Sequence, residues 1–283
     1  MTTAARDQRA GAGVVRSTES SGNRVAKKNR FEPSGFVQWR VLTARTVRTM
    51  VRKGELLVAV IAPLIFTLGF YLPLKFVMQF QGIDYAQFLM PIIVLQAMAF
   101  TAISSAQRAS TEAMTGLSTR LKTMPVAIGA PLMARMSSAF IRSIVTLTAA
   151  LIYGHVIGFR FSAGLGQAVM FGAMAMAIST VLSFGADAIG TMSKSPEATS
   201  QALTLPQLIL GMASTGFVPE SGFPEWIRPF VRNQPISQFS AAMRDMADGT
   251  VQFSVIFPAL AWIVGCAVLL VPLALWASLR RRD

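Results

Sequence analysis

Six stretches of this 283-residue chain contain no Asp, Glu, Lys or Arg, and their lengths of 17 to 31 residues limit the possible folds. These stretches are 56–74, 85–107, 143–159, 161–186, 198–219 and 249–279. A helix that rises 1.5 Å per residue needs about 20 apolar residues to cross a bilayer. Since only 14% of the residues are charged, the chain is neither a soluble globular protein nor a disordered one. The pattern predicts an all-α integral membrane protein with six transmembrane helices.

The positive charges lie mostly on one side of these stretches. If the first stretch begins in the cytoplasm, the inner segments hold 21 of the 26 Lys and Arg residues and the outer segments hold 5. The net charge is then +13 inside and zero outside, as the positive-inside rule predicts. We therefore expect a multi-pass protein of the cytoplasmic membrane with both termini in the cytoplasm. The charge excess sets topology and does not indicate nucleic-acid binding.

The N-terminal segment has no signal-peptide core, so we expect it to be retained. Residues 1–34 predict a disordered basic tail, which either attracts anionic headgroups or serves only as a topology signal. Residues 35–55 have a helical pattern with an apolar face (Phe36, Trp39, Val47, Met50, Val51) and a basic face (Arg45, Arg48, Arg52). Such a helix lies in the headgroup plane or packs on a partner. The transmembrane domain is then 56–280.

Two polar segments between the stretches are large enough to carry a function. The inner loop, 108–136, is basic and contains several turn residues. The outer segment, 216–249, has aromatic residues separated by four prolines. It predicts short re-entrant or interfacial helices before the sixth span, or alternatively a loop anchored by an aromatic belt.

Few ionisable residues lie in or beside the apolar stretches. His155 could be a titrating gate, the base of an intramembrane hydrolase, or a neutral packing residue. Arg142 and Asp187 lie near the inner ends of the third and fourth helices, where they either form an ion pair between helices or snorkel separately. No stretch has a charged residue at its centre, which disfavours an ion-coupled secondary transporter and indicates that another chain supplies the energy.

Several catalytic signatures are missing from the sequence. It has no P-loop, no Gly-x-Ser-x-Gly motif, one cysteine and one histidine. We therefore expect no catalytic, cofactor or metal site. The alternatives are an ion-coupled secondary transporter and, less favoured, a membrane enzyme that uses His155.

Three runs in the outer segment carry a family resemblance: Gly216-Phe217-Val218-Pro219, Phe223-Pro224-Glu225-Trp226-Ile227-Arg228-Pro229-Phe230 and Asn233-Gln234-Pro235-Ile236-Ser237. Together with the span pattern, they resemble the type-2 family of ABC exporter permeases. The similarity is to actinobacterial permeases of the daunorubicin/doxorubicin-resistance type, including mycobacterial exporters of phthiocerol-type lipids. Arg120-Leu121 and Pro125-Val126 resemble the inner-loop motif of this family, in which Glu often stands where this chain has Thr119.

The resemblance implies a permease subunit without an ATPase site, which exports a hydrophobic lipid or drug across the bilayer. ATP and magnesium would bind to a separate ATPase subunit, and a second permease, identical or homologous, would complete the transporter. We expect the inner loop to contact the ATPase through Leu117, Thr119, Arg120, Leu121 and Pro125. We expect the outer segment to form a gate from Phe217, Phe223, Trp226, Phe230, Asn233 and Gln234.

Overall fold

The computed structural model describes residues 34–80, 82, 84–115, 129–162, 164–193 and 195–280. The chain divides into two units, Met1–Pro33 and Ser34–Asp283, and every described residue belongs to the second. The described residues form helices and no strand, which confirms the all-α prediction. Of the expected tail over 1–34, only Ser34 is among them, and it caps the first helix.

The described part of the chain contains nine α-helices and one 3-10 helix. They are α1 (Gly35–Arg52), α2 (Glu55–Gln79), α3 (Tyr85–Met114), α5 (Ala130–Ile157), α6 (Leu165–Met192), α7 (Pro196–Met212), η1 (Glu220–Gly222), α8 (Arg228–Asn233), α9 (Pro235–Asp248) and α10 (Phe253–Arg280). Within the segment 35–55, α1 ends at Arg52 and Glu55 already begins α2, while the outer segment contains η1, α8 and α9.

Among the described residues, five helices are long and apolar enough to cross a membrane, namely α2, α3, α5, α6 and α10. The stretch expected to form the fifth of six spans, 198–219, instead contributes most of α7, which has 17 residues. This helix ends at Met212, and turns follow up to Gly216, which packs so closely on Ile92 that a Cβ would collide with it. The count of six spans is therefore not confirmed, because α7 is shorter than the stretch that predicted it.

Local sequence explains where several helices begin and end. Asp84 caps α3 by accepting a hydrogen bond from the backbone N–H of Ala86, and Ser195 caps α7 in the same way through Ala198. Pro196 occupies the first helical position of α7, where its missing N–H is not needed. Gly158 ends α5 with a φ of 111°, a left-handed conformation that favours glycine.

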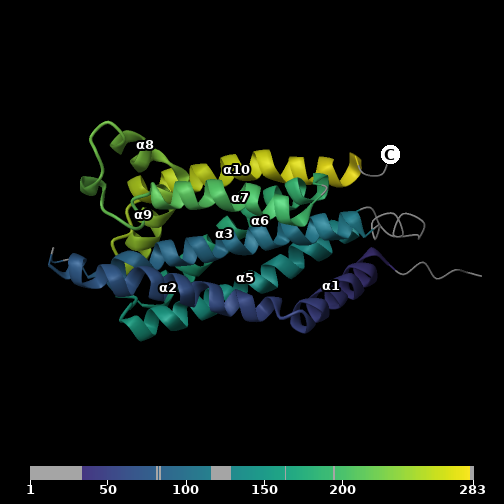
Figure 1. Ribbon diagram of the computed structural model, residues 1–283, viewed down its shortest axis with the longest axis horizontal. Helices are drawn as coiled ribbons and strands as arrows, with labels where there is room; N and C mark the ends of the chain where they lie inside the picture. The colour runs from purple at the N-terminus through teal and green to yellow at the C-terminus, as the bar shows by residue number, and fades with distance from the viewer. Residues whose placement is uncertain are drawn as a thin grey trace, which may run out of the picture. The chain divides into compact units, whose positions relative to one another are not determined.

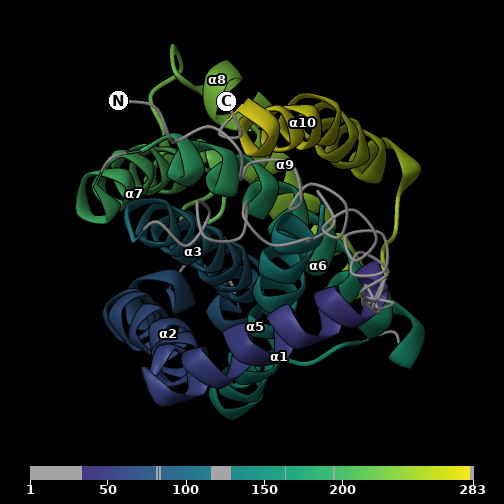
Figure 2. The ribbon, with the colours of Figure 1, turned by 90° about the vertical axis from the view of Figure 1, so that its right-hand side faces the viewer.

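The long helices of the second unit lie side by side, with α1 at one end and α8 and α9 at the other (Figure 1). The view along the bundle shows α1 lying across the ends of α2 and α5 (Figure 2). We call these the α1 end and the α9 end. The α1 end also contains the end of α3, the start of α5 and the end of α6.

Helix α3 forms the centre of the bundle. It is buried over 78% of its most apolar segment, against 6% for α10, and it packs on α2, α5, α6, α7 and α9. Its closest neighbour is α6, where a Cβ on Gly190 would collide with the backbone carbonyl of Ala106. The two helices therefore meet backbone to backbone, which only a glycine permits at this position.

Candidate functional site

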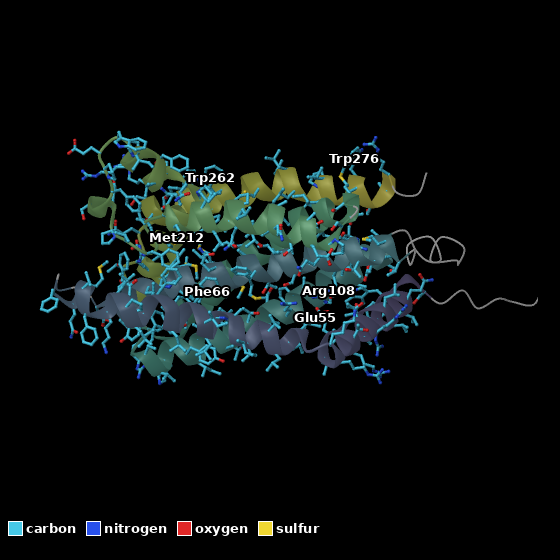
Figure 3. The ribbon with its side chains drawn as sticks, in the orientation of Figure 1. Glu55, Phe66, Arg108, Met212, Trp262 and Trp276 are labelled. Atoms are coloured by element: carbon cyan, nitrogen blue, oxygen red, sulfur yellow. The ribbon has the colours of Figure 1, made fainter. Side chains whose placement is uncertain are left out.

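The α1 end contains six charged side chains from four helices, which we call the ion cluster: Glu55, Arg108, Glu112, Arg135, Arg142 and Asp187. Glu55, the first residue of α2, joins α3 and α5. Its Oε2 lies 3.2 Å from Nη2 of Arg108 and 3.5 Å from Nη1 of Arg142. Glu55 and Arg108 face one another between α2 and α3 (Figure 3). One carboxylate thus holds two guanidinium groups on two different helices.

Arg135 is central to the rest of the ion cluster in the way that Glu55 is central to Arg108 and Arg142. Its Nε and Nη2 donate to the two carboxylate oxygens of Asp187 at 2.6 and 2.9 Å, and its Nη1 lies 3.5 Å from Glu112 Oε2. The Asp187 side chain is only 1% exposed, so this bidentate pair neutralises a buried charge. Arg135 connects α3, α5 and α6.

The prediction that Arg142 pairs with Asp187 is wrong. Asp187 pairs with Arg135, which lies two helical turns before Arg142 on α5, nearer the α1 end. Arg142 lies deeper in the bundle and pairs with Glu55. Arg135 lies within the segment 108–136 that was expected to be a loop, and it was therefore not expected to pair with a helix residue.

The ion cluster has three cations and three anions, so it carries no net charge. Each of its side chains is at most 28% exposed, and removing one partner from a buried pair costs about 3–5 kcal/mol. Because the members come from α2, α3, α5 and α6, the ion cluster ties together the ends of four helices. A displacement of any one of these helix ends therefore acts on the other three.

Helical spacing could have revealed most of the ion cluster. Arg108 and Glu112 are four residues apart on α3, and Arg135 and Arg142 are seven apart on α5, so each pair lies on one helix face. The charge-free stretches stop short of these residues, whereas α3 continues to Met114 and α5 begins at Ala130. The expected inner-loop contacts Leu117, Thr119, Arg120, Leu121 and Pro125 lie outside the described residues.

The predicted gate residues occupy different environments at the α9 end. Phe217 is buried, and its ring centroid lies 4.2 Å from that of Phe70 on α2. Trp226 is 81% exposed and Phe230 is 54% exposed, whereas Phe223 is half-buried. The structure thus separates a buried aromatic anchor from two aromatic side chains at the surface.

The two polar residues of the predicted gate differ as well. Asn233 is exposed and its Nδ2 donates to the carbonyl of Pro229 at 2.9 Å. Gln234 is buried, and its Nε2 donates to the carbonyls of Leu210 and Ala213. These carbonyls lie at the C-terminal end of α7 and in the residue that follows it, where no further helical N–H is available to bond them. Gln234 therefore caps α7 and does not face water.

Arg244 of α9 is a structural residue of the α9 end that sequence analysis missed. Its guanidinium donates to the carbonyls of Phe88, Thr215 and Gly216 at 2.9–3.0 Å and lies 3.8 Å from the Phe88 ring centroid. Burial lowers the pKa of Arg244 to about 10, against the opposing effect of Asp248. This side chain fixes the turn after α7 to the start of α3.

Polar side chains also pair within the bundle, between its two ends. Gln207 of α7 donates to the buried Gln96 of α3. The hydroxyls of Ser143 and Ser179 lie 2.7 Å apart and join α5 to α6. Hydrogen bonds of this kind hold helices together where no water competes. Within the apolar stretches, the expectations from the sequence concerned ionisable residues, so they did not include these pairs.

The described part of the chain gathers no set of metal-ligating side chains. No group of three His, Cys, Asp or Glu side chains there could hold a metal ion. His155 is exposed on α5, and its backbone carbonyl accepts a hydrogen bond from Arg160. The site is instead a set of interactions between helices.

Comparison with known proteins identifies the family. Residues 79–276 match the family described as ABC-2 family transporter protein. The chain belongs to the ABC-2 transporter family. It is 41% identical over 251 residues to the doxorubicin resistance ABC transporter permease protein DrrB of Mycobacterium tuberculosis (strain ATCC 25618 / H37Rv), which covers 84% of this chain and 86% of that protein.

Two further relatives carry related names. The probable doxorubicin resistance ABC transporter permease protein DrrC of the same strain is 35% identical over 164 residues, covering 56% of this chain and 58% of that protein. The daunorubicin resistance ABC transporter permease protein DrrB1 of Streptomyces coeruleorubidus is 26% identical over 245 residues, covering 85% and 84%. No solved structure shows significant similarity to the chain.

These findings confirm the resemblance to drug-resistance permeases of the ABC type. This ABC-2 protein is a multi-pass membrane protein and a transport component. The match to the family spans α3 to most of α10, which includes every member of the ion cluster except Glu55.

Proposed function

We propose that this ABC-2 protein is the permease subunit of an ATP-driven exporter that moves hydrophobic or amphipathic molecules from the α1 end to the α9 end. The observation that carries this proposal is the ion cluster, which ties four helices together where the inner loop leaves the bundle. The loop emerges from α3 and returns into α5, and both helices carry members of the ion cluster. A force on the loop would thus reach α2 and α6 as well.

The α1 end lies in the cytoplasm in this proposal, and residues 220–248 lie outside. The orientation follows from the excess of Lys and Arg in the segments assigned to the inner side. It can be tested with Ser21→Cys and Ser221→Cys, each in a Cys266→Ser background. An impermeant thiol reagent added to intact cells should label only the cysteine at 221, and labelling at 21 would reverse the orientation.

A separate ATPase subunit would dock on the inner loop through Leu117, Thr119, Arg120, Leu121 and Pro125, and would itself bind ATP and magnesium. Apolar side chains with one basic residue suit an interface with an acidic groove. When the ATPase subunits close, the loop moves and the ion cluster distributes this movement among the helix ends. The permease needs no catalytic residue of its own.

A second permease would complete the path, either as a second copy or as a homologue. The relatives in Mycobacterium tuberculosis carry two different permease names, DrrB and DrrC, which supports a heteromeric pair. Their names refer to doxorubicin resistance, so the proposed substrate is an amphipathic drug or a lipid of similar character. The exposed Trp226 and Phe230 would face this substrate as it leaves at the outer surface.

The decisive experiment is reconstitution in liposomes with and without the ATPase subunit. We expect doxorubicin transport to require both the ATPase and ATP. Arg120→Glu should reduce ATPase association and transport while membrane insertion stays normal, and Arg48→Gln on the exposed side of α1 is the matched control. Transport by the permease alone, driven by an ion gradient, would instead establish a secondary transporter.

A further inference from the structure

A pocket of about 220 Å³ opens at the α1 end beside the ion cluster. Helix α1 forms one wall, and the ends of α3 and α5 form the others. Trp39 of α1 anchors this wall, because its Nε1 donates to Ser137 Oγ of α5 at 2.9 Å. The pocket is therefore a built feature of the fold and not a gap beside a loose helix.

The pocket is positively charged. Four cations line it, namely Arg45, Lys53, Arg108 and Arg135, against the two carboxylates of Glu55 and Glu112. Asp187 engages Arg135 from outside the pocket, but neither Arg45 nor Lys53 forms an ion pair with a described residue. The charge balance of the lining therefore favours an anion.

Arg108 adds an independent indication of a missing ligand. Its two terminal nitrogens, Nη1 and Nη2, are buried and make no hydrogen bond within the described part of the chain. Nη2 lies 3.2 Å from Glu55, but the contact lacks hydrogen-bond geometry. A buried guanidinium donor without an acceptor is unfavourable, and an anion in the pocket would supply acceptors.

The apolar part of the lining indicates what kind of anion fits. Leu42, Met50, Pro131 and Ala134 line the pocket together with the cations. Beyond the pocket, α1 exposes Phe36, Val41 and Val51, which suit contact with acyl chains. The volume admits a small headgroup but not a helix of a partner protein. An anion attached to an apolar chain satisfies both parts of the lining.

We propose that this pocket binds the phosphate group of an anionic phospholipid of the inner leaflet. Arg45 and Lys53 attract the headgroup at the rim, Arg108 donates to its phosphate oxygens, and the apolar residues contact the start of the acyl chains. The leaflet assignment rests on the proposed orientation, whereas the binding itself does not depend on transport. A bound lipid would join α1 to α3 and α5.

The test measures lipid retention on the permease purified together with its ATPase subunit. The complex is placed in nanodiscs that contain phosphatidylglycerol and phosphatidylcholine, extracted into detergent and analysed by native mass spectrometry. The test variant is Arg45→Gln/Lys53→Gln. The control is Arg40→Gln/Arg48→Gln, which removes two exposed charges from α1 outside the pocket.

We expect the test variant to retain about 5- to 20-fold less phosphatidylglycerol than the wild type, since each cation near an anionic headgroup contributes about a fivefold effect. The control variant should retain the wild-type amount. Equal loss in both variants would overturn the proposal, because binding would then depend on the overall charge of α1.

Two other outcomes would also overturn it. If inorganic phosphate raises the unfolding temperature of the complex in phosphatidylcholine nanodiscs as much as phosphatidylglycerol does, the ligand is a free anion. If the test variant loses the ATPase subunit but keeps the lipid, the pocket serves a protein partner. Lipid retention is measured without transport. The experiment would therefore still test lipid binding in the pocket if the exporter proposal failed.

Discussion

The α1 end and the α9 end of the bundle are stabilised by different kinds of interaction. At the α1 end, charged side chains on different helices contact each other, as Arg135 and Asp187 do. At the α9 end, long polar side chains bind backbone carbonyls, as Arg244 and Gln234 do. Coulomb attraction decreases gradually with distance, whereas a hydrogen bond is lost beyond a narrow range of distance and angle. The α1 end can therefore shift at contacts that lack hydrogen-bond geometry, such as Glu55 with Arg108, while staying bound, and the α9 end is the more rigid of the two.

The largest effect is expected at the centre of the ion cluster. Arg135→Gln leaves the buried carboxylate of Asp187 without its bidentate partner, which should lower the free energy of unfolding by about 3–5 kcal/mol. Thermal unfolding in detergent measures this. The double variant Arg135→Gln/Asp187→Asn should recover most of the loss. If the double variant is as unstable as the single one, the stability of the α1 end does not come from this ion pair.

A smaller loss is expected at the α9 end. Arg244→Lys keeps the charge but cannot donate to three carbonyls in one plane, so it should destabilise the protein by about 2–3 kcal/mol. Limited proteolysis should show faster cleavage between 216 and 249. The exposed Arg232→Lys is the control, with no expected change. Full retention of stability by the Arg244 variant would contradict the rigidity assigned to this end.

The middle of the bundle should respond less than either end. Gln207→Leu removes the hydrogen bond to the buried Gln96, and such bonds between membrane helices contribute about 0.6 to 1.7 kcal/mol. Unfolding of the protein in mixed micelles would measure the change. Leu205→Ala, at an exposed position of α7, should change stability less. A loss of stability as large as that of Arg135→Gln would mean that the hydrogen bond between Gln207 and Gln96 stabilises the bundle as much as the ion cluster does.

The smallest effect on stability is expected for Trp226→Ala, because this side chain is 81% exposed. Stability should change by about 0.5 kcal/mol or less, but export per folded complex should fall if the residue contacts the leaving substrate. Phe217→Ala should have the opposite profile, with a stability loss of about 3 kcal/mol from the buried site. Unchanged export in the Trp226 variant would remove this residue from the outer gate.

The sequence predicts the helical class and most of the long helices because a charge-free stretch of about 20 residues forms a helix when it crosses a membrane. The limits of these stretches do not predict the ion cluster, since helices α3 and α5 extend into polar sequence that resembles a loop, and only the helical spacing of its members indicates it. Nor does the sequence predict that Gln234 is buried while the adjacent Asn233 is exposed. That difference depends on the carbonyls at the end of α7, which lie more than 20 residues away along the chain. Contacts between distant segments decide the role of each side chain.

The placement of Asp187 on α6 has a consequence for biosynthesis. The ribosome makes α2, α3 and α5 first, so Glu55, Arg108, Glu112, Arg135 and Arg142 are all synthesised before Asp187. During this interval the unfinished ion cluster has three cations and two carboxylates, and Glu112 is the acceptor that the structure provides for Arg135. The arrival of α6 in the membrane supplies the missing negative charge. Completion of the ion cluster thus marks the point at which these six side chains balance one another, and a chain that stalls before α6 retains an unbalanced arginine in the cluster.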